Sequence, residues 1–432
     1  MDRRVLAQET LLQYRDEIVR VIQDLVRMPS QNTPPDGAER VCQEYVADYL
    51  RRIGLLVDMY EPDKVPGLVE HPAFWPGRHY TGRPNVSSTL AGKGGGRSLL
   101  LTGHMDTVPL GDNVWSKPPW GADIQDGRMY GLGTIDMKGA MGAMMVLCKA
   151  LVEKKIPLRG ALSFESVVDE EEAGVNATIA GRLRYGPMDG AVIPENTALQ
   201  IYPAARGILD TIFTFRNRKA ALHQAGTGGQ GKAGAVEQIG IFITHLHELE
   251  ESRSRHPIHP LYAGYSTPAP IEIAKVYAGG WGSQNPVAVP PEGRIELLVE
   301  TLPGEEQVAV QREQDEWMAG LVARYPEVLA EGPDTRHPIR YLPGTAMDPK
   351  HPLVKTMRDS IRRALGREPI VTGAPYACDM FALHQIFGMP ALLFGPAGGN
   401  AHAADEYLEM DSLFEFFETL MVFVMEWCGL KE

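Results

Sequence analysis

The chain contains little cysteine and no long apolar run. Its 432 residues include four cysteines, Cys42, Cys148, Cys378 and Cys428. They lie far apart and form no CxxC pair, which argues against a disulfide framework or a thiolate zinc site and favours reduced thiols in the cytoplasm. No window approaches 18 apolar residues, so we expect no transmembrane helix, and the charged N-terminal segment lacks the apolar core of a signal peptide.

Positive charge is also scarce relative to negative charge. The chain has 42 Lys and Arg against 55 Asp and Glu, which gives a formal net charge of −13. A surface of this sign repels a phosphate backbone, so we expect no nucleic-acid partner. The Gly-rich run GTGGQGKAG at residues 226–234 has no Ser or Thr after its Lys, which argues against a phosphate-binding loop.

The patterns that are present alternate between strand and helix. Apolar strands are predicted at residues 85–90, 98–102 and 160–168, and a helix of small residues at 138–155 separates the last two. A strand, a helix and a strand at this spacing predict a βαβ unit. With a further amphipathic helix at residues 11–28, the predicted fold class is α/β, a mostly parallel sheet with helices on both faces.

The composition changes after Glu195 and changes back near residue 336. The intervening stretch is predicted to hold strands at residues 208–215, 271–277 and 294–300 and helices at 235–251 and 305–325. This pattern is typical of a small α+β unit. We therefore expect one α/β domain, formed by residues 1–206 and 336–432, that is interrupted by an inserted α+β domain at residues 207–335.

Histidines and carboxylates follow the predicted strands of the α/β domain. The strand in LLLTGHMDTVP ends on His104, and Asp106 follows two residues later. Four further segments carry such side chains: Asp136 in YGLGTIDMKGA, Glu170 and Glu171 in SFESVVDEEEAG, Glu195 in AVIPENT, and His402 in FGPAGGNAHAADE. In an open α/β sheet ligands bind beyond the carboxyl ends of the strands, so we expect these side chains to converge.

This set of side chains predicts a metal site. Imidazole and carboxylate ligands without thiolate suit hard to borderline divalent metals, and two ions can be held if one carboxylate bridges them. Asp106 is predicted to hydrogen-bond the second ring nitrogen of His104 and so to fix its tautomer. Each motif taken singly has a simpler explanation, such as a surface turn or a solvated helix start. Their coincidence at strand ends favours the metal site.

Five segments, in order, resemble the motifs of a known enzyme family. They are GHMDTVP, GLGTIDMKGA, VVDEEEAG, IPENT and GPAGGNAHAADE. The family is that of the zinc-dependent amidohydrolases, which include acetylornithine deacetylase, succinyl-diaminopimelate desuccinylase, aminoacylase and glutamate carboxypeptidase. The resemblance spans nearly the whole chain. It implies a catalytic domain interrupted by a lid domain, through which two chains form a homodimer.

The resemblance also implies a metal-binding role for five residues. His104 and Glu195 would hold one ion, Glu171 and His402 would hold the other, and Asp136 would bridge the two. The ions would be Zn²⁺ or Mn²⁺, with Co²⁺ as a further candidate, and one of them can be weakly occupied. The peptide bond after Asp136 is similar to one that is cis in the family.

The general base and its support follow from the same resemblance. Glu170 would act as the base, and Asp106 would be the partner that orients His104. Three consecutive glutamates leave a second register open, in which Glu171 is the base and Glu172 is the ligand.

Four further positions concern the substrate, three of them in the predicted insertion and one shortly after it. His223, in NRKAALHQAG, resembles a histidine that reaches the partner subunit's active site and stabilises the developing oxyanion. Asn285, in WGSQNPVAVPP, resembles an asparagine that contacts substrate. Thr301 stands where several family members have an arginine that binds a substrate carboxylate, and Arg340, in HPIRYLPG, is a candidate replacement.

The predicted function is hydrolysis of a C–N amide bond in a small substrate, such as an N-acyl amino acid or a dipeptide. A metal-activated water would attack, with a glutamate as base. The missing arginine favours an alternative, a hydrolytic deaminase that acts on an aromatic amine. A non-catalytic binding protein on the same fold is a third hypothesis, which the complete set of ligand positions disfavours.

Overall fold

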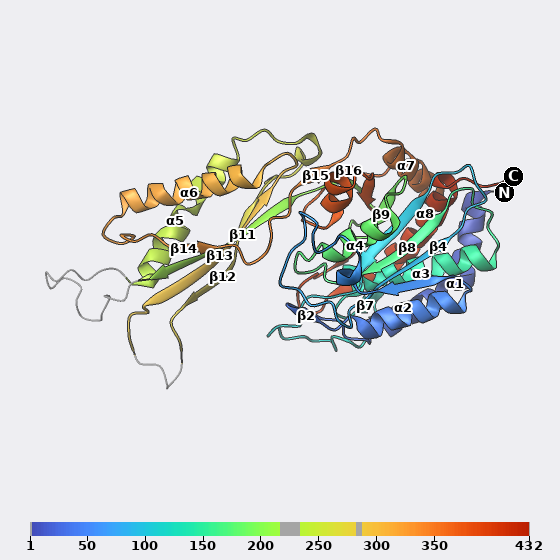
Figure 1. The fold of residues 1–432 in the computed structure, drawn as a ribbon, viewed down its shortest axis with the longest axis horizontal. Helices are drawn as coiled ribbons and strands as arrows, with labels where there is room; N and C mark the ends of the chain where they lie inside the picture. Colours follow the sequence, from blue (N-terminus) through green and yellow to red (C-terminus); the bar gives the residue numbers. More distant parts are fainter. Residues whose placement is uncertain (1, 217–233, 282–286, 432) are drawn as a thin grey trace. The chain divides into compact units, whose positions relative to one another are not determined.

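The computed structural model describes residues 2–216, 234–281 and 287–431, and it divides into two compact units. The first unit comprises Met1–Ala204, Ala346–Ala374 and Cys378–Glu432, and the second comprises Ala205–Thr345 and Pro375–Ala377. Figure 1 shows both units as ribbons. Within the described part of the chain, no helix is long and apolar enough to cross a membrane.

The second boundary lies about ten residues later than the sequence predicts, at 345/346 instead of 335/336. The reason is that the segment after residue 335 packs on the sheet of the second unit. Ile208 and Leu342 exchange backbone hydrogen bonds of 2.8 and 3.2 Å, and the Nδ1 of His337 lies 2.9 Å from the carbonyl oxygen of Asp210.

A nine-stranded sheet forms the centre of the first unit, in the order β15-β10-β17-β9-β5-β8-β4-β3, with β16 paired to β10. The strands are β3 (Val57–Tyr60), β4 (Asn85–Leu90), β5 (Leu99–His104), β8 (Leu162–Val167), β9 (Ala191–Ile193), β10 (Ile201–Ala205), β15 (Thr345–Ala346), β16 (Val371–Ala374) and β17 (Ala391–Leu393). The central strands β17, β9, β5 and β8 are parallel. Strands β10, β4 and β3 pair antiparallel at either side.

Helices cover both faces of this sheet, as the sequence predicts. They are α1 (Arg3–Val26), α2 (Arg40–Arg52), α3 (Gly139–Glu153), α4 (Asn176–Tyr185), α7 (Pro352–Leu365) and α8 (Met410–Trp427), with short turns η1 (Pro62–Lys64), η2 (Thr134–Lys138) and η4 (Ala382–Ile386). Successive residues of β8 point to opposite faces. Glu165 pairs with Arg182 of α4, whereas Ser166 donates to Gln43 of α2. The helix α4 lies outside the predicted elements.

A second, smaller sheet of the first unit is also absent from the predicted elements. It has the order β18-β19-β7-β6. Its strands are β6 (Asp123–Gln125), β7 (Arg128–Tyr130), β18 (Gly398–Gly399) and β19 (Tyr407–Glu409), and a separate two-stranded ribbon is formed by β1 (Asn32–Thr33) and β2 (Asp36–Gly37). The pairing of β19 with β7 joins the loop that contains His402 to the loop that contains Asp136.

The second unit is an antiparallel sheet packed against two helices. Its order is β12-β13-β11-β14. The elements are β11 (Gly207–Arg216), α5 (Ala235–Arg253), η3 (Pro260–Tyr262), β12 (Ile271–Ala278), β13 (Glu292–Thr301), α6 (Gln307–Arg324) and β14 (Asp334–Arg336). Phe242 of α5 is fully buried, and its ring lies 4.9 Å from the rings of both Phe213 and Trp317. The predicted α+β character of the insertion is confirmed.

Candidate metal centre

The strand β5 ends on His104, whose side chain is buried. Its Nδ1 lies 3.0 Å from the backbone carbonyl oxygen of Asp106 and 3.7 Å from the carboxylate of the same residue. A carbonyl oxygen only accepts hydrogen bonds, so Nδ1 carries the proton and Nε2 keeps its lone pair for a metal. The backbone carbonyl of Asp106 is thus the nearer partner of Nδ1, and the carboxylate that was predicted for this contact lies at 3.7 Å.

Asp136 lies between the two histidines. Its Oδ1 is 3.1 Å from Nε2 of His104, and its Oδ2 is 3.3 Å from Nε2 of His402. The peptide between Asp136 and Met137 is cis, as the resemblance implies. Each carboxylate oxygen therefore faces one imidazole, which is the arrangement that a bridging ligand needs.

The glutamates complete two groups around this carboxylate. Glu171 Oε2 is 2.9 Å from Nε2 of His402. Glu170 Oε2 and Glu195 Oε1 each lie 3.9 Å from Nε2 of His104. The structure thus brings together His402 with Glu171, and His104 with Glu170 and Glu195. In this arrangement the first two glutamates of the acidic run approach the histidines, which agrees with the favoured register.

These side chains fit a divalent metal. Ligand atoms of His104, Asp136 and Glu171 all lie within 4.8 Å of one another. A tetrahedral ion bound at about 2.0 Å separates its ligand atoms by about 3.3 Å, close to the shorter distances given above. Nitrogen and carboxylate oxygen are ligands that Zn²⁺ accepts, and Mn²⁺ shares the preference for oxygen.

The electrostatics of the cluster also favour a cation. Burial raises the pKa of Glu170 and of Glu195 well above the usual carboxyl range, and neighbouring carboxylates raise both further. Burial disfavours a charge on His402, but Asp136 and Glu171 outweigh it and raise its pKa to about 12. Several buried acids at one place are costly unless positive charge compensates them. A divalent cation held by these ligands would supply that charge.

A buried network that sequence reasoning missed holds the acidic turn. Asp106 Oδ2 accepts hydrogen bonds of 3.0 Å from the side chain of Asn32 and from the backbone N–H of Glu171. The same Asn32 amide donates to Asp169 at 3.1 Å, and Asp169 also accepts from the Tyr80 hydroxyl at 2.7 Å. The backbone at the predicted ligand Glu171 is therefore held in place by this buried network.

Arg83 closes this network. Its guanidinium pairs with Glu39 at 2.5 Å and lies 3.5 Å from Asp169, and all three side chains are almost fully buried. It also donates to the Asn32 side chain at 3.3 Å. Asn32 and Arg83 lie in Pro-containing loop segments without strand or helix periodicity, so the sequence carries no signal that they meet.

The structure gives less information about the predicted substrate-related positions. His223 and Asn285 lie outside the described residues. Arg340 is a half-buried residue of the second unit, and its substrate contact stays a prediction. Thr301 is buried at the end of β13, and its hydroxyl lies 3.1 Å from that of Tyr341. This threonine is therefore part of the packing within its own unit.

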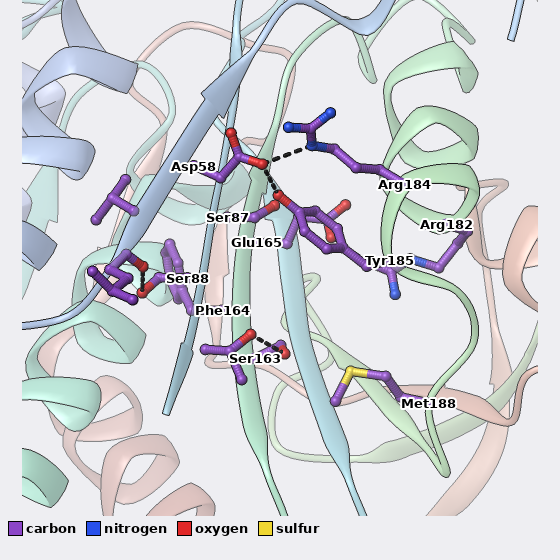
Figure 2. Close-up of a pocket in the computed structure, with 13 residues that line it drawn as sticks. Asp58, Ser87, Ser88, Ser163, Phe164, Glu165, Arg182, Arg184, Tyr185 and Met188 are labelled. Carbon is purple, nitrogen blue, oxygen red and sulfur yellow. Dashed lines mark hydrogen bonds and ion pairs between the residues drawn. The ribbon is translucent and has the colours of Figure 1, made fainter. Parts of the chain in front are cut away.

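A cavity of about 490 Å³ lies beside α4, and none of the predicted metal ligands lines it. Figure 2 shows Arg184 and Tyr185 meeting Asp58 at one end, where both donate to the same carboxylate oxygen. The buried pair of Glu165 and Arg182 lies nearby. These contacts attach α4 to the sheet, and they supply none of the chemistry gathered around Asp136.

An α/β unit that gathers two histidines and several buried acids around one carboxylate defines the class of protein, a metal-dependent hydrolase. Residues 100–426 match the family model described as Peptidase family M20/M25/M40, and the chain belongs to this family. The predicted hydrolysis of C–N bonds is thereby confirmed at the level of the family.

Curated relatives match most of the chain. It is 26% identical to an N-formyl-4-amino-5-aminomethyl-2-methylpyrimidine deformylase from Halalkalibacterium halodurans, over 97% of this chain and 96% of that protein. It is 28% identical to an acetylornithine deacetylase from Salmonella typhimurium, over 75% and 78% of the two chains. The two relatives are a deformylase and a deacetylase, so the deaminase alternative is not favoured.

Solved structures share the fold. Human carnosine dipeptidase 1 superposes with a TM-score of 0.72 at 17% identity, over 100% of this chain and 99% of the other. A dinuclear metal-binding peptidase of the M20 family from Bacillus subtilis superposes with a TM-score of 0.58 at 17% identity, over 96% and 99%. The two-unit α/β architecture is thus that of known M20 enzymes.

Proposed function

We propose that this protein removes a short acyl group from the nitrogen of a small amine at a centre for two divalent ions. The observation that carries the proposal is the Asp136 carboxylate, whose two oxygens face His104 and His402. Asp136 would bridge the ions, with Glu195 joining His104 at one of them and Glu171 joining His402 at the other. The solved relative described as dinuclear supports two ions, and the donor set supports Zn²⁺ or Mn²⁺, with Co²⁺ as a further candidate.

The residues divide the reaction between them. Bound divalent ions supply Lewis acidity, which lets a water lose its proton near neutral pH. Glu170 accepts this proton and later returns it to the leaving amine. Beside the cations the Glu170 carboxylate would be ionised, so it would act first as a base. Asp106 keeps His104 in the tautomer that leaves Nε2 free, and His223 stabilises the oxyanion from the partner subunit.

The substrate is an N-acylated amine that need not carry a carboxylate. Thr301 replaces the arginine that binds such a group in several family members, and the deformylase relative is named for a pyrimidine substrate. Asn285 and Arg340 remain the proposed substrate contacts.

A panel of N-formyl and N-acetyl compounds tests this proposal. Amines with and without an α-carboxylate are compared, and the products are measured. We expect release of formate or acetate together with the free amine, including from substrates that lack a carboxylate. Release of ammonia from an aromatic amine, without a carboxylic acid product, would instead establish the deaminase.

We propose further that two chains associate through the second unit, in the cytoplasm, where the four cysteines stay reduced. The strand β12 is the edge of its sheet and exposes Val276 and Tyr277. An exposed edge strand with apolar side chains is a template for pairing with a second chain. Sedimentation at micromolar concentration is expected to give twice the chain mass of 47.5 kDa. A species of single chain mass at every concentration would contradict the dimer.

A further inference from the structure

The hairpin between β18 and β19 carries a second important side chain besides His402. Glu406 follows four residues later, and it is almost fully buried. Its Oε2 accepts a hydrogen bond of 2.9 Å from the backbone N–H of Gly133. Its Oε1 accepts two more, from the N–H groups of Ile135 at 2.9 Å and of Asp136 at 3.2 Å. The carboxylate thus binds the loop that presents Asp136.

The backbone of this loop departs from helical geometry at the predicted bridging residue. Asp136 and Met137 have non-helical backbone angles inside η2 (φ −123°, ψ 89° and φ −133°, ψ 26°). N–H groups in such a turn need acceptors from elsewhere when they are buried. Glu406 supplies both oxygens to three of them, and its backbone carbonyl accepts a fourth bond of 2.9 Å from Gly131.

We propose that Glu406 is a positioning residue that fixes the bridging Asp136 relative to His402. This inference rests on the proposed two-metal function. One short segment then carries both a ligand, His402, and the group that locates the bridging ligand. The distance of 3.3 Å between His402 Nε2 and Asp136 Oδ2 is set by this connection. Glu406 acts through the backbone of the loop and touches neither ion nor substrate.

The neighbouring Asp405 offers a matched control. Its carboxylate also accepts backbone hydrogen bonds, of 2.8 Å from Ser116 and 3.0 Å from Lys117. These amides belong to a different loop, which carries none of the predicted ligands. Adjacent acids of one hairpin therefore hold two separate loops, and only the loop held by Glu406 presents a ligand.

The test measures metal affinity in Glu406→Gln, Glu406→Asp and Asp405→Asn. The apo-proteins are titrated with Zn²⁺ and with Mn²⁺ in competition with a chelator under native conditions. Glutamine keeps one acceptor oxygen, but its amide NH₂ group replaces the other oxygen and so places a donor against a backbone N–H donor. We expect the metal dissociation constants of Glu406→Gln to rise about 10- to 100-fold, the range typical of changes behind a metal ligand. Glu406→Asp, which keeps both acceptors, falls in between, and Asp405→Asn matches the wild type.

The melting temperature of each apo-protein separates positioning from stability alone. If Glu406 only stabilises the fold, its variants melt earlier but bind metal with wild-type affinity, and the inference is overturned. Should Glu406→Gln fail to fold, the dissociation constants of Glu406→Asp decide in the same way. A wild type that binds neither metal would overturn the proposed function, and the inference with it.

Discussion

Glu170→Gln is expected to lower kcat by about 10²- to 10⁴-fold, which is the contribution of a positioned general base. Glutamine has nearly the same size but cannot accept a proton from water. Glu170 is proposed as the base and not as a ligand, so its replacement should leave the metal bound. The measurement is steady-state hydrolysis beside metal content. The expected result is full metal content with almost no turnover.

Glu172→Gln is the matched control for this substitution. It changes the third glutamate of the same run, which the second register would make a ligand. We expect metal content and turnover close to those of the wild type. Loss of metal in Glu172→Gln, with normal metal in Glu171→Gln, would shift the assignment by one residue. Normal turnover in Glu170→Gln would show that another group is the base.

The second large effect is expected from Asp136→Asn. Asparagine has a single, neutral side-chain oxygen. It therefore cannot place one anionic oxygen beside His104 and another beside His402. Loss of a bridging ligand should cost more than the roughly 100-fold upper range for residues behind a ligand. We expect activity to fall by more than this factor and metal content to drop. Elemental analysis and hydrolysis assays on the same preparation measure both.

Asp123→Asn controls for the loss of one negative charge nearby in the sequence. Asp123 is an exposed residue of β6 and has no proposed role. Its variant should keep both metal and activity. If Asp136→Asn kept its metal and its turnover, the bridging role would be wrong, whatever the other ligands do.

The positions of the site residues could be predicted because each follows a recognisable local pattern. His104 ends an apolar strand, and Glu195 follows another, so the rule that strand ends converge was sufficient to group them. The mostly parallel sheet and the helices on both faces follow from the same alternation. The interruption by an α+β unit was visible in the change of composition.

The contacts that hold the site together correspond to no such local pattern in the sequence. The strands β7 and β19 are three residues long, and their pairing joins residues 128–130 to residues 407–409, which no local periodicity encodes. In the sequence, Glu406 is one of several polar residues after His402, and only the structure shows which loop it binds. The same holds for Asn32 and Arg83, whose contacts cross large sequence separations.

Asp106 illustrates how tertiary contacts decide which atom of a residue meets its neighbour. The spacing of two residues indicated that it orients His104. The backbone carbonyl of Asp106 lies nearest the ring nitrogen, whereas its carboxylate accepts hydrogen bonds from Asn32 and from the Glu171 amide. Local sequence fixes the neighbourhood of such a residue, and tertiary contacts select the atom.

The metal content of the purified protein tests the central claim most directly. Elemental analysis of the wild type beside His104→Ala and His402→Ala is the measurement. Two equivalents of divalent metal in the wild type, with a loss in each variant, is the predicted result. A wild type without bound metal after incubation with Zn²⁺ or Mn²⁺, indistinguishable from both variants, would contradict the two-metal centre.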